Sequence, residues 1–124
     1  MLIGIGLDLV DIREFQSEVD ERREAWLARV FSAEERKYCE NQPDPYRHLA
    51  GTFAVKEAAL KALGTGWTDD SDLRDVEIFR REGKPQIAFG GSVMKLSKRR
   101  KVRRQFVSIT HTKDYSAAVV VLES

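Results

Sequence analysis

The chain has few of the residues that would cross-link it or anchor it in a membrane. Its 124 residues include a single cysteine, Cys39, which excludes an intramolecular disulfide and a zinc site built from several cysteines. We expect Cys39 to be a free buried thiol. No apolar run approaches the roughly 20 residues that span a bilayer, and the apolar residues 1–6 lack the basic start of a signal peptide. The sequence therefore predicts a soluble cytoplasmic protein with no membrane partner.

Loops that hold nucleotides are missing as well. The sequence contains neither the pattern GxxxxGK followed by Ser or Thr nor a GxGxxG turn that opens a helix, which excludes kinase-like and dinucleotide-binding sites. A strong net charge is also lacking, since the formal charge is +1. Residues 98–104 form a basic run, but no aromatic side chains interleave it as binding to single-stranded nucleic acid would use. We expect a solvated basic face there and no nucleic-acid partner.

The first third of the chain contains a strand and three helices by its hydrophobic spacing. Residues 3–10 alternate as a strand does, with one face wholly apolar and the other carrying two glycines and an acid. Apolar residues at helical spacing predict short helices around residues 12–19 and 26–31. A capping box that starts at Ser32 predicts a further helix to about residue 40.

The rest of the chain combines one long helix with antiparallel strands. The long helix should run from residue 47 to 63 and end at Gly64 in the left-handed conformation. Four side chains form its core-facing stripe: Leu49, Phe53, Leu60 and Leu63. After it we expect a loop at 65–72, strands at 75–79 and 86–89, a short helix from about 91, and strands at 106–112 and 115–122. The predicted fold is one α+β domain, residues 1–124, whose mostly antiparallel sheet packs against the long central helix and shorter helices.

Three charged residues stand out as candidates for chemistry. Asp8 lies within an apolar strand, where burial of an unpaired carboxylate is costly, so we expect a cation, a metal ion or several donors beside it. The neighbouring glycines would leave room for a ligand, although Asp8 could instead cap the following helix. Glu57 and Lys61 are four residues apart on the long helix, a spacing that also suits an ordinary surface ion pair. Near the C-terminus, one hairpin brings the imidazole of His111 close to several hydroxyl groups.

Three motifs in this order resemble those of the holo-acyl-carrier-protein synthases, the short type of the 4'-phosphopantetheinyl transferase superfamily. They are GIGLDLV at residues 4–10, FAVKEAALKALGTG at residues 53–66, and VSITHT at residues 107–112. The middle motif, with its K-E-x-x-x-K core, is highly specific. The resemblance covers nearly the whole chain and implies the fold of that superfamily.

The resemblance implies an enzyme that transfers 4'-phosphopantetheine from coenzyme A to a serine of an apo acyl carrier protein in fatty acid biosynthesis, releasing 3',5'-ADP. The residues matching Asp8 and Glu57 hold Mg2+ in that family, and Mg2+ favours carboxylate and phosphate oxygens. Lys61 would neutralise charge on the leaving diphosphate. The base that takes the serine proton would be Glu57 or a water molecule on the metal ion.

The resemblance also implies a homotrimer in which coenzyme A lies across subunit boundaries. From one subunit the nucleotide would meet Lys61 and Gly64, and from the next Ser108, His111 and Thr112, with Lys84 and Pro85 nearby and Arg47 beside its phosphates. The acidic carrier protein would dock on basic residues around the first helix: Arg22, Arg23 and Arg29.

One departure from the family pattern concerns phosphate binding. Many members have an arginine where this chain has Thr52, and the run at 98–104 is a possible compensating source of positive charge. A different function remains open from the residues alone: a non-catalytic α+β binding module whose basic segment engages nucleic acid or an acidic protein. Such a module would have no use for two interior acids at positions 8 and 57.

Overall fold

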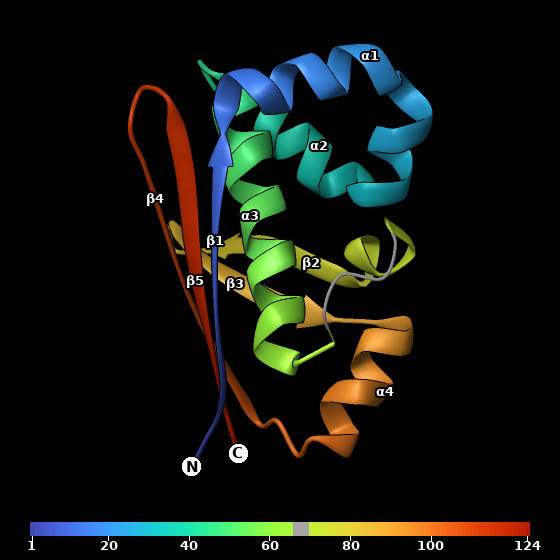
Figure 1. The fold of residues 1–124 in the computed structure, drawn as a ribbon, viewed down its shortest axis with the longest axis vertical. Coiled ribbons are helices and arrows are strands. Elements are labelled where there is room, and N and C mark those ends of the chain that lie inside the picture. The colour runs from blue at the N-terminus through green and yellow to red at the C-terminus, as the bar shows by residue number, and fades with distance from the viewer. Residues whose placement is uncertain (66–69) are drawn as a thin grey trace.

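Helix α3 (Pro45–Leu63) runs through the middle of the molecule and organises everything around it (Figure 1). The computed structural model describes residues 1–65 and 70–124. On one side of α3 lies an antiparallel sheet in the order β1–β5–β4, made of β1 (Leu2–Asp11), β5 (Tyr115–Glu123) and β4 (Arg104–His111). Helices α1 (Ile12–Val30) and α2 (Ala33–Glu40) cover another side.

The remaining elements complete the side of α3 away from the sheet. Strands β2 (Val76–Arg81) and β3 (Lys84–Phe89) form a separate antiparallel hairpin, which follows the 3-10 helix η1 (Asp70–Asp75). Helix α4 (Gly91–Arg99) leads back to the sheet. This arrangement confirms the predicted α+β class and antiparallel pairing. No helix among the described residues has the length and apolar character needed to cross a membrane.

Local sequence signals fixed the helix ends closely. Ser32 accepts a hydrogen bond from the Glu35 N–H while the Glu35 side chain accepts one from the Ser32 N–H, which confirms the capping box. Gly64 ends α3 in the left-handed region at φ 77°. Helix α3 begins at Pro45, two residues before the predicted start, because proline suits the first helical position and Asp44 caps it. The two helices predicted before Ser32 are the two arms of α1, which bends at Arg23.

The predictions for the later segments needed two adjustments. The loop expected at 65–72 is wrong in part, because residues 70–75 form η1, and its residues 66–69 lie outside the described part of the chain. The first hairpin is longer than predicted, since β2 and β3 are joined by Glu82 and Gly83 alone, both at positive φ, as a tight hairpin turn requires. Cys39 is a free thiol and 1% exposed, as predicted.

Strand β1 turns its glycine face, not its apolar face, toward the molecule. A Cβ on Gly4 or Gly6 would collide with the backbone carbonyl of Ala62 or Ala58 on α3. The expectation that these glycines leave room for a ligand is therefore wrong: the room is taken by the backbone of α3, which approaches the strand unusually closely.

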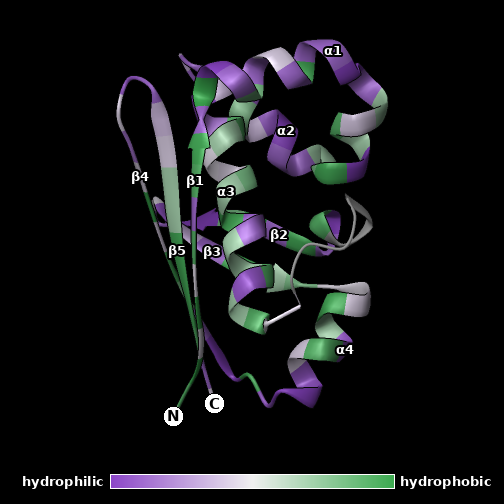
Figure 2. Cartoon of the chain, viewed as in Figure 1, coloured by the Kyte–Doolittle hydropathy of each residue, from purple (hydrophilic) through white to green (hydrophobic). Residues whose placement is uncertain are grey.

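The apolar face of the same strand lies outside. Leu7 is 65% exposed and Leu9 is 64% exposed. Other exposed apolar residues of the sheet are Leu2, Ile5, Phe106 and Tyr115. Figure 2 shows hydrophobic residues in β1 and β5 as well as in the helices they cover. The sheet thus has one face on α3 and one apolar face that the described residues leave uncovered.

Candidate active site

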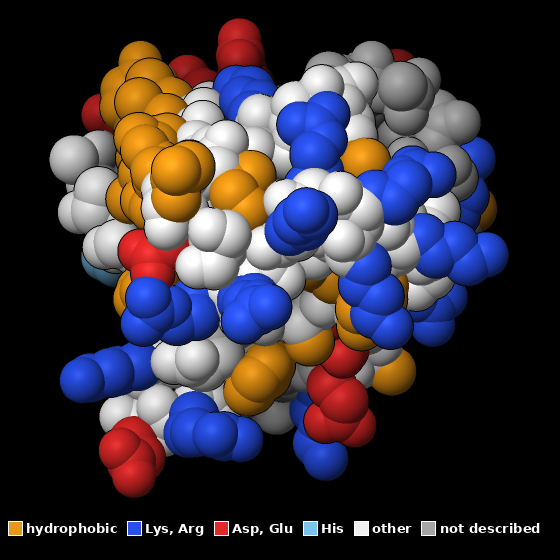
Figure 3. Space-filling view, turned by 90° about the horizontal axis from the view of Figure 1, so that it is seen from below, with side chains coloured by type: hydrophobic (Ala, Val, Ile, Leu, Met, Phe, Trp, Pro, Cys, Tyr) orange, Lys and Arg blue, Asp and Glu red, His pale blue; other side chains and the backbone are white. Residues whose placement is uncertain are grey.

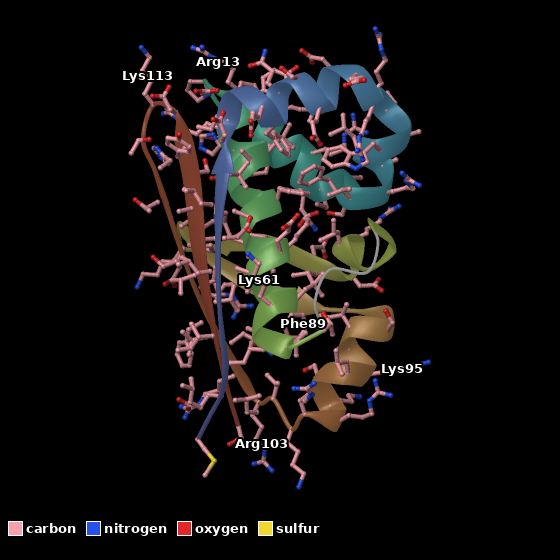
Figure 4. All side chains as sticks on the ribbon, in the orientation of Figure 1. Arg13, Lys61, Phe89, Lys95, Arg103 and Lys113 are labelled. Atoms are coloured by element: carbon pink, nitrogen blue, oxygen red, sulfur yellow. The ribbon has the colours of Figure 1, made fainter. Side chains whose placement is uncertain are left out.

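Asp8 and Lys61 join β1 to the last turns of α3. Asp8 lies on the glycine face of β1, and its side chain is only 11% exposed. The Lys61 Nζ donates to Asp8 Oδ1 over 2.9 Å and to the Leu7 carbonyl oxygen over 3.0 Å. Figure 4 labels Lys61 on α3, beside β1. Asp8 does not cap the following helix, because Asp11 does so by accepting from the Glu14 N–H. The cation expected beside Asp8 is therefore Lys61.

Glu57 lies one helical turn before Lys61 on the same side of α3 and is half-buried. The second carboxylate oxygen of Asp8 makes no hydrogen bond within the described residues. The residues that the structure describes contain no group of three or more His, Cys, Asp or Glu side chains placed to hold a metal ion. A metal here would rest on two carboxylates and take its other ligands from substrate and water, which is the usual way that Mg2+ binds to proteins.

The end of α3 is strongly basic. The guanidinium of Arg100 lies against Gly64, 3.3 Å from the point that a Cβ would occupy there. Figure 3 looks onto this end of the molecule and shows Lys and Arg side chains spread across it, with hydrophobic side chains gathered toward the sheet. The basic run 98–104 therefore lies beside the Lys61 end of α3, not beside Thr52, which is buried and donates to the His48 carbonyl oxygen.

A second group of predicted residues meets at the other end of α3. Four of them line a cavity of about 300 Å³: Arg47, Pro85, Ser108 and His111. Lys84 is exposed beside Pro85 and does not line this cavity. Thr112 is occupied in the β4–β5 turn, where its Oγ1 accepts from the backbone N–H groups of Asp114 and Tyr115. The structure thus brings four of these six predicted coenzyme A-binding residues together.

The same cavity contains side chains that sequence reasoning missed. Tyr38, His48 and Arg80 also line it. Arg80 follows Val76 and Ile78 on the inward face of β2, so a charge in an otherwise apolar period-two pattern was the signal that could have revealed it. A neighbouring cavity of about 490 Å³ is lined partly by Thr52 and Arg80 and does not reach Asp8.

The two groups of site residues are far apart within one chain. Arg47 lies in the first turn of α3 and Lys61 in the last. Their separation along the helix is about 21 Å at 1.5 Å per residue. The predicted site residues of one chain therefore lie in two separate groups.

A buried ion pair joins α3 to α2. Lys56, the residue before Glu57, is fully buried, and its Nζ bonds Glu35 Oε1 at 2.9 Å. It also donates to the carbonyl oxygens of Leu73 and Val76, which ties α3 to η1 and β2. Burial lowers the pKa of the Lys56 ammonium from its ordinary value, and the Glu35 carboxylate opposes that shift. No feature of the sequence distinguished this lysine from an exposed one.

Comparison with known proteins decides the family. The sequence model of the 4'-phosphopantetheinyl transferase superfamily matches residues 4–120. The chain belongs to this superfamily. It is 41% identical over 123 residues to a holo-acyl-carrier-protein synthase of Syntrophotalea carbinolica, covering 98% of this chain and 96% of that protein. A synthase of the same name from Geobacter sulfurreducens is 38% identical, with 99% and 98% covered.

Solved structures agree with this assignment. The synthase of Neisseria meningitidis superimposes with a TM-score of 0.89 at 30% identity over the whole of both chains. The Helicobacter pylori synthase in complex with coenzyme A gives 0.81 at 28% identity, covering 96% of this chain and 99% of that one. The predicted family, enzyme class and fold are therefore confirmed, and the comparisons do not favour a non-catalytic binding module.

Proposed function

We propose that this protein catalyses the Mg2+-dependent transfer of 4'-phosphopantetheine from coenzyme A to a serine of an apo acyl carrier protein, in support of fatty acid biosynthesis. The observation that carries this proposal is the junction of β1 and α3, where Lys61 binds Asp8 of a distant motif and Glu57 lies one helical turn before Lys61. The relatives are named for this reaction, and three solved relatives contain coenzyme A or 3',5'-ADP.

The reaction needs a proton acceptor and positive charge at the diphosphate. The serine oxygen attacks the phosphorus that carries the pantetheine arm, the bond from that phosphorus to the bridging oxygen breaks, and 3',5'-ADP leaves with the electron pair. A carboxylate on α3, Glu57, is the chain's own candidate to accept the serine proton. Lys61 would place its ammonium beside the oxygens of the leaving group, where negative charge grows. Asp8 holds that ammonium in position from β1.

Asp8 and Glu57 fit a magnesium ion by their chemistry. Both offer carboxylate oxygens, and one oxygen of Asp8 has no hydrogen-bond partner within the described residues. When bound there, Mg2+ would supply positive charge to the diphosphate of the donor. Two protein ligands leave the remaining coordination positions for phosphate oxygens and water.

The uncovered sheet face supports a homotrimer. A row of exposed apolar residues on β1 is more than a monomer normally leaves in contact with water. In the proposed trimer, the cavity around Arg47 of one chain would lie next to the Lys61 end of another. The two groups of site residues, about 21 Å apart in one chain by helix rise, would then form one site between neighbours.

The carrier protein would approach α1. Arg13, Arg22 and Arg23 are exposed there, and an acidic partner would be drawn to them. Because such attraction between exposed charges is screened by salt, raising the ionic strength should slow turnover by raising KM for the carrier.

The test is a direct assay of group transfer. The protein is mixed with coenzyme A, Mg2+ and apo acyl carrier protein, and mass spectrometry measures the phosphopantetheine increment on the carrier serine. We expect the increment with Mg2+ and none with excess EDTA. Asp8→Asn should abolish it, whereas Glu40→Gln, an exposed carboxylate on α2, should not. No increment from the wild-type protein with any bacterial apo carrier would refute the proposal.

A further inference from the structure

The chain concentrates its positive charge at one end of the molecule. Residues 95–104 hold seven of the 21 Lys and Arg residues and none of the 20 Asp and Glu residues, so the rest of the chain is net acidic. All seven side chains are exposed, and Figure 3 shows how widely Lys and Arg cover this end. Together they form a surface that we call the basic face: Lys95, Lys98, Arg99, Arg100, Lys101, Arg103 and Arg104. Figure 4 labels two of them, Lys95 and Arg103.

The cations of the basic face are almost all without a counter-charge. Among the described residues, Arg104 is the one member in an ion pair, which it forms with Glu123. Val93 and Ser97 are the buried residues of α4, so the Lys and Arg side chains of this helix project into solvent. Like charges that gather in this way repel one another. An anionic partner surface would remove that repulsion.

The basic face lies beside the proposed site. The Arg100 guanidinium is 3.3 Å from the point that a Cβ on Gly64 would occupy. Gly64 follows Lys61 by about 4.5 Å of helix rise. A protein that presents a serine at Lys61 would cover about 800 Å² of this surface, which is a disc with a radius of about 16 Å. Such a footprint includes Gly64 and reaches Arg100, so an acceptor protein at the site also meets the basic face.

Helix α1 cannot supply the attraction for an acidic protein alone. It carries four arginines but five acidic residues, so its own charge is slightly negative. One of those arginines, Arg22, lies 6.0 Å from the centre of the Trp26 ring. The electrostatic potential that draws an acidic partner from a distance must therefore come from another part of the surface.

We propose that the basic face is the main electrostatic docking surface for the acidic carrier protein. The proposal rests on the proposed function and adds a second contact region to α1. Charge complementarity between the partners selects the carrier, and proximity to Lys61 places it where its serine can react. Opposite charges on two surfaces mainly speed the encounter of the partners and set its dependence on salt.

The experiment measures carrier binding without turnover. The probe is a fluorescently labelled apo acyl carrier protein whose acceptor serine is replaced by alanine, and fluorescence anisotropy gives its Kd. Three double variants each remove two exposed positive charges, from the basic face, from α1 and from other exposed positions as the matched control. They are Lys98→Gln with Arg99→Gln, Arg13→Gln with Arg22→Gln, and Lys37→Gln with Arg81→Gln.

The expected result is a salt-dependent loss in the basic-face variant. At about 50 mM NaCl its Kd should rise on the order of tenfold, against about threefold or less for the α1 variant and within about twofold for the control. At about 0.5 M NaCl the Debye length falls to about 4 Å, so all variants should bind within about twofold of the wild type.

The other outcomes separate this proposal from the proposed reaction. If the wild type transfers nothing but binds the carrier with this dependence, the proposed reaction fails and the docking surface stands. A larger loss in the α1 variant than in the basic-face variant would overturn the docking surface. Carrier binding that stays unchanged in the basic-face variant would also overturn it, whether that variant raises KM for coenzyme A or loses binding to vesicles of anionic phospholipid.

Discussion

Replacing Lys56 by methionine should destabilise the protein severely, because this side chain is fully buried and its charge is paired with Glu35. Its ammonium donates to Glu35 Oε1 at 2.9 Å, to the Leu73 carbonyl oxygen at 3.0 Å and to the Val76 carbonyl oxygen. These three acceptors account for all three protons of the ammonium group. The pair therefore joins α2, α3 and the start of β2 at one buried point.

The size of the loss follows from what the substitution leaves behind. Methionine would fill the space of the lysine stem but leave the Glu35 carboxylate, 3% exposed, without its cation. That carboxylate would keep only the backbone N–H groups of Ser32 and Ile78, each 2.8 Å away. Removing one partner of a buried ion pair typically costs about 3–5 kcal/mol. For a domain of this size, that loss corresponds to a fall in Tm of roughly 10–20 °C.

Urea denaturation followed by tryptophan fluorescence would measure the loss. Trp26 reports on this region, because its ring lies 6.2 Å from that of Phe31 and the Lys56 Nζ lies 5.7 Å from the same Phe31 ring. The control is Lys37→Met on the exposed face of α2, which should change the free energy of unfolding by less than about 0.5 kcal/mol.

A double-mutant cycle separates the ion pair from simple packing. Glu35→Gln alone should also be costly, since it leaves the ammonium buried without a counter-charge. If the pair is coupled, the double variant Glu35→Gln with Lys56→Met should lose less than the sum of the two single losses, by about 1–3 kcal/mol. A Lys56→Met protein as stable as the wild type, or strictly additive losses, would refute this reasoning.

Three further predictions concern the site, the assembly and the thiol. Asp8→Asn should lower kcat on the order of a hundredfold or more in the transfer assay while Tm stays close to that of the wild type, because the pair with Lys61 is partly solvated. If the proposed homotrimer uses the exposed face of β1, Leu7→Glu should give a monomer in sedimentation velocity and abolish transfer, and a trimer that persists would contradict that interface. Burial raises the pKa of the Cys39 thiol, so the unfolded chain releases this proton first and the free energy of unfolding should fall as pH rises above about 8.5. In Cys39→Ala, the free energy of unfolding measured as a function of pH should no longer show this fall.

The parts of the fold predicted from the sequence are those with local causes. A capping box requires only Ser32 and Glu35, and a left-handed cap requires only Gly64 at the end of an apolar stripe, so both could be recognised in place. The motif residues Asp8 and Lys61 were expected at one site, and their ion pair joins β1 to α3, two elements with the whole of α1 and α2 between them in the sequence.

Features that depend on which surfaces pack together could not be predicted from local sequence. Lysine is rarely fully buried, yet three acceptors from different segments make the burial of Lys56 possible. Arg80 has no motif around it, and only the packing of β2 against α2 places it over Tyr38. In both cases the deciding contacts join residues more than ten positions apart, so no local window of sequence contains them.

The orientation of β1 links the chemistry of the site to the need for partners. Alternation shows that a strand has two faces but does not show which of them its own chain covers. Here, the glycine face must be the inner one, because only a strand without side chains at positions 4 and 6 lets α3 approach closely enough for Lys61 to reach the carboxylate of Asp8. The same choice directs Ile5, Leu7 and Leu9 outward. A single alternating pattern therefore builds the candidate metal site on one face and leaves on the other an apolar surface that another copy of the chain can cover.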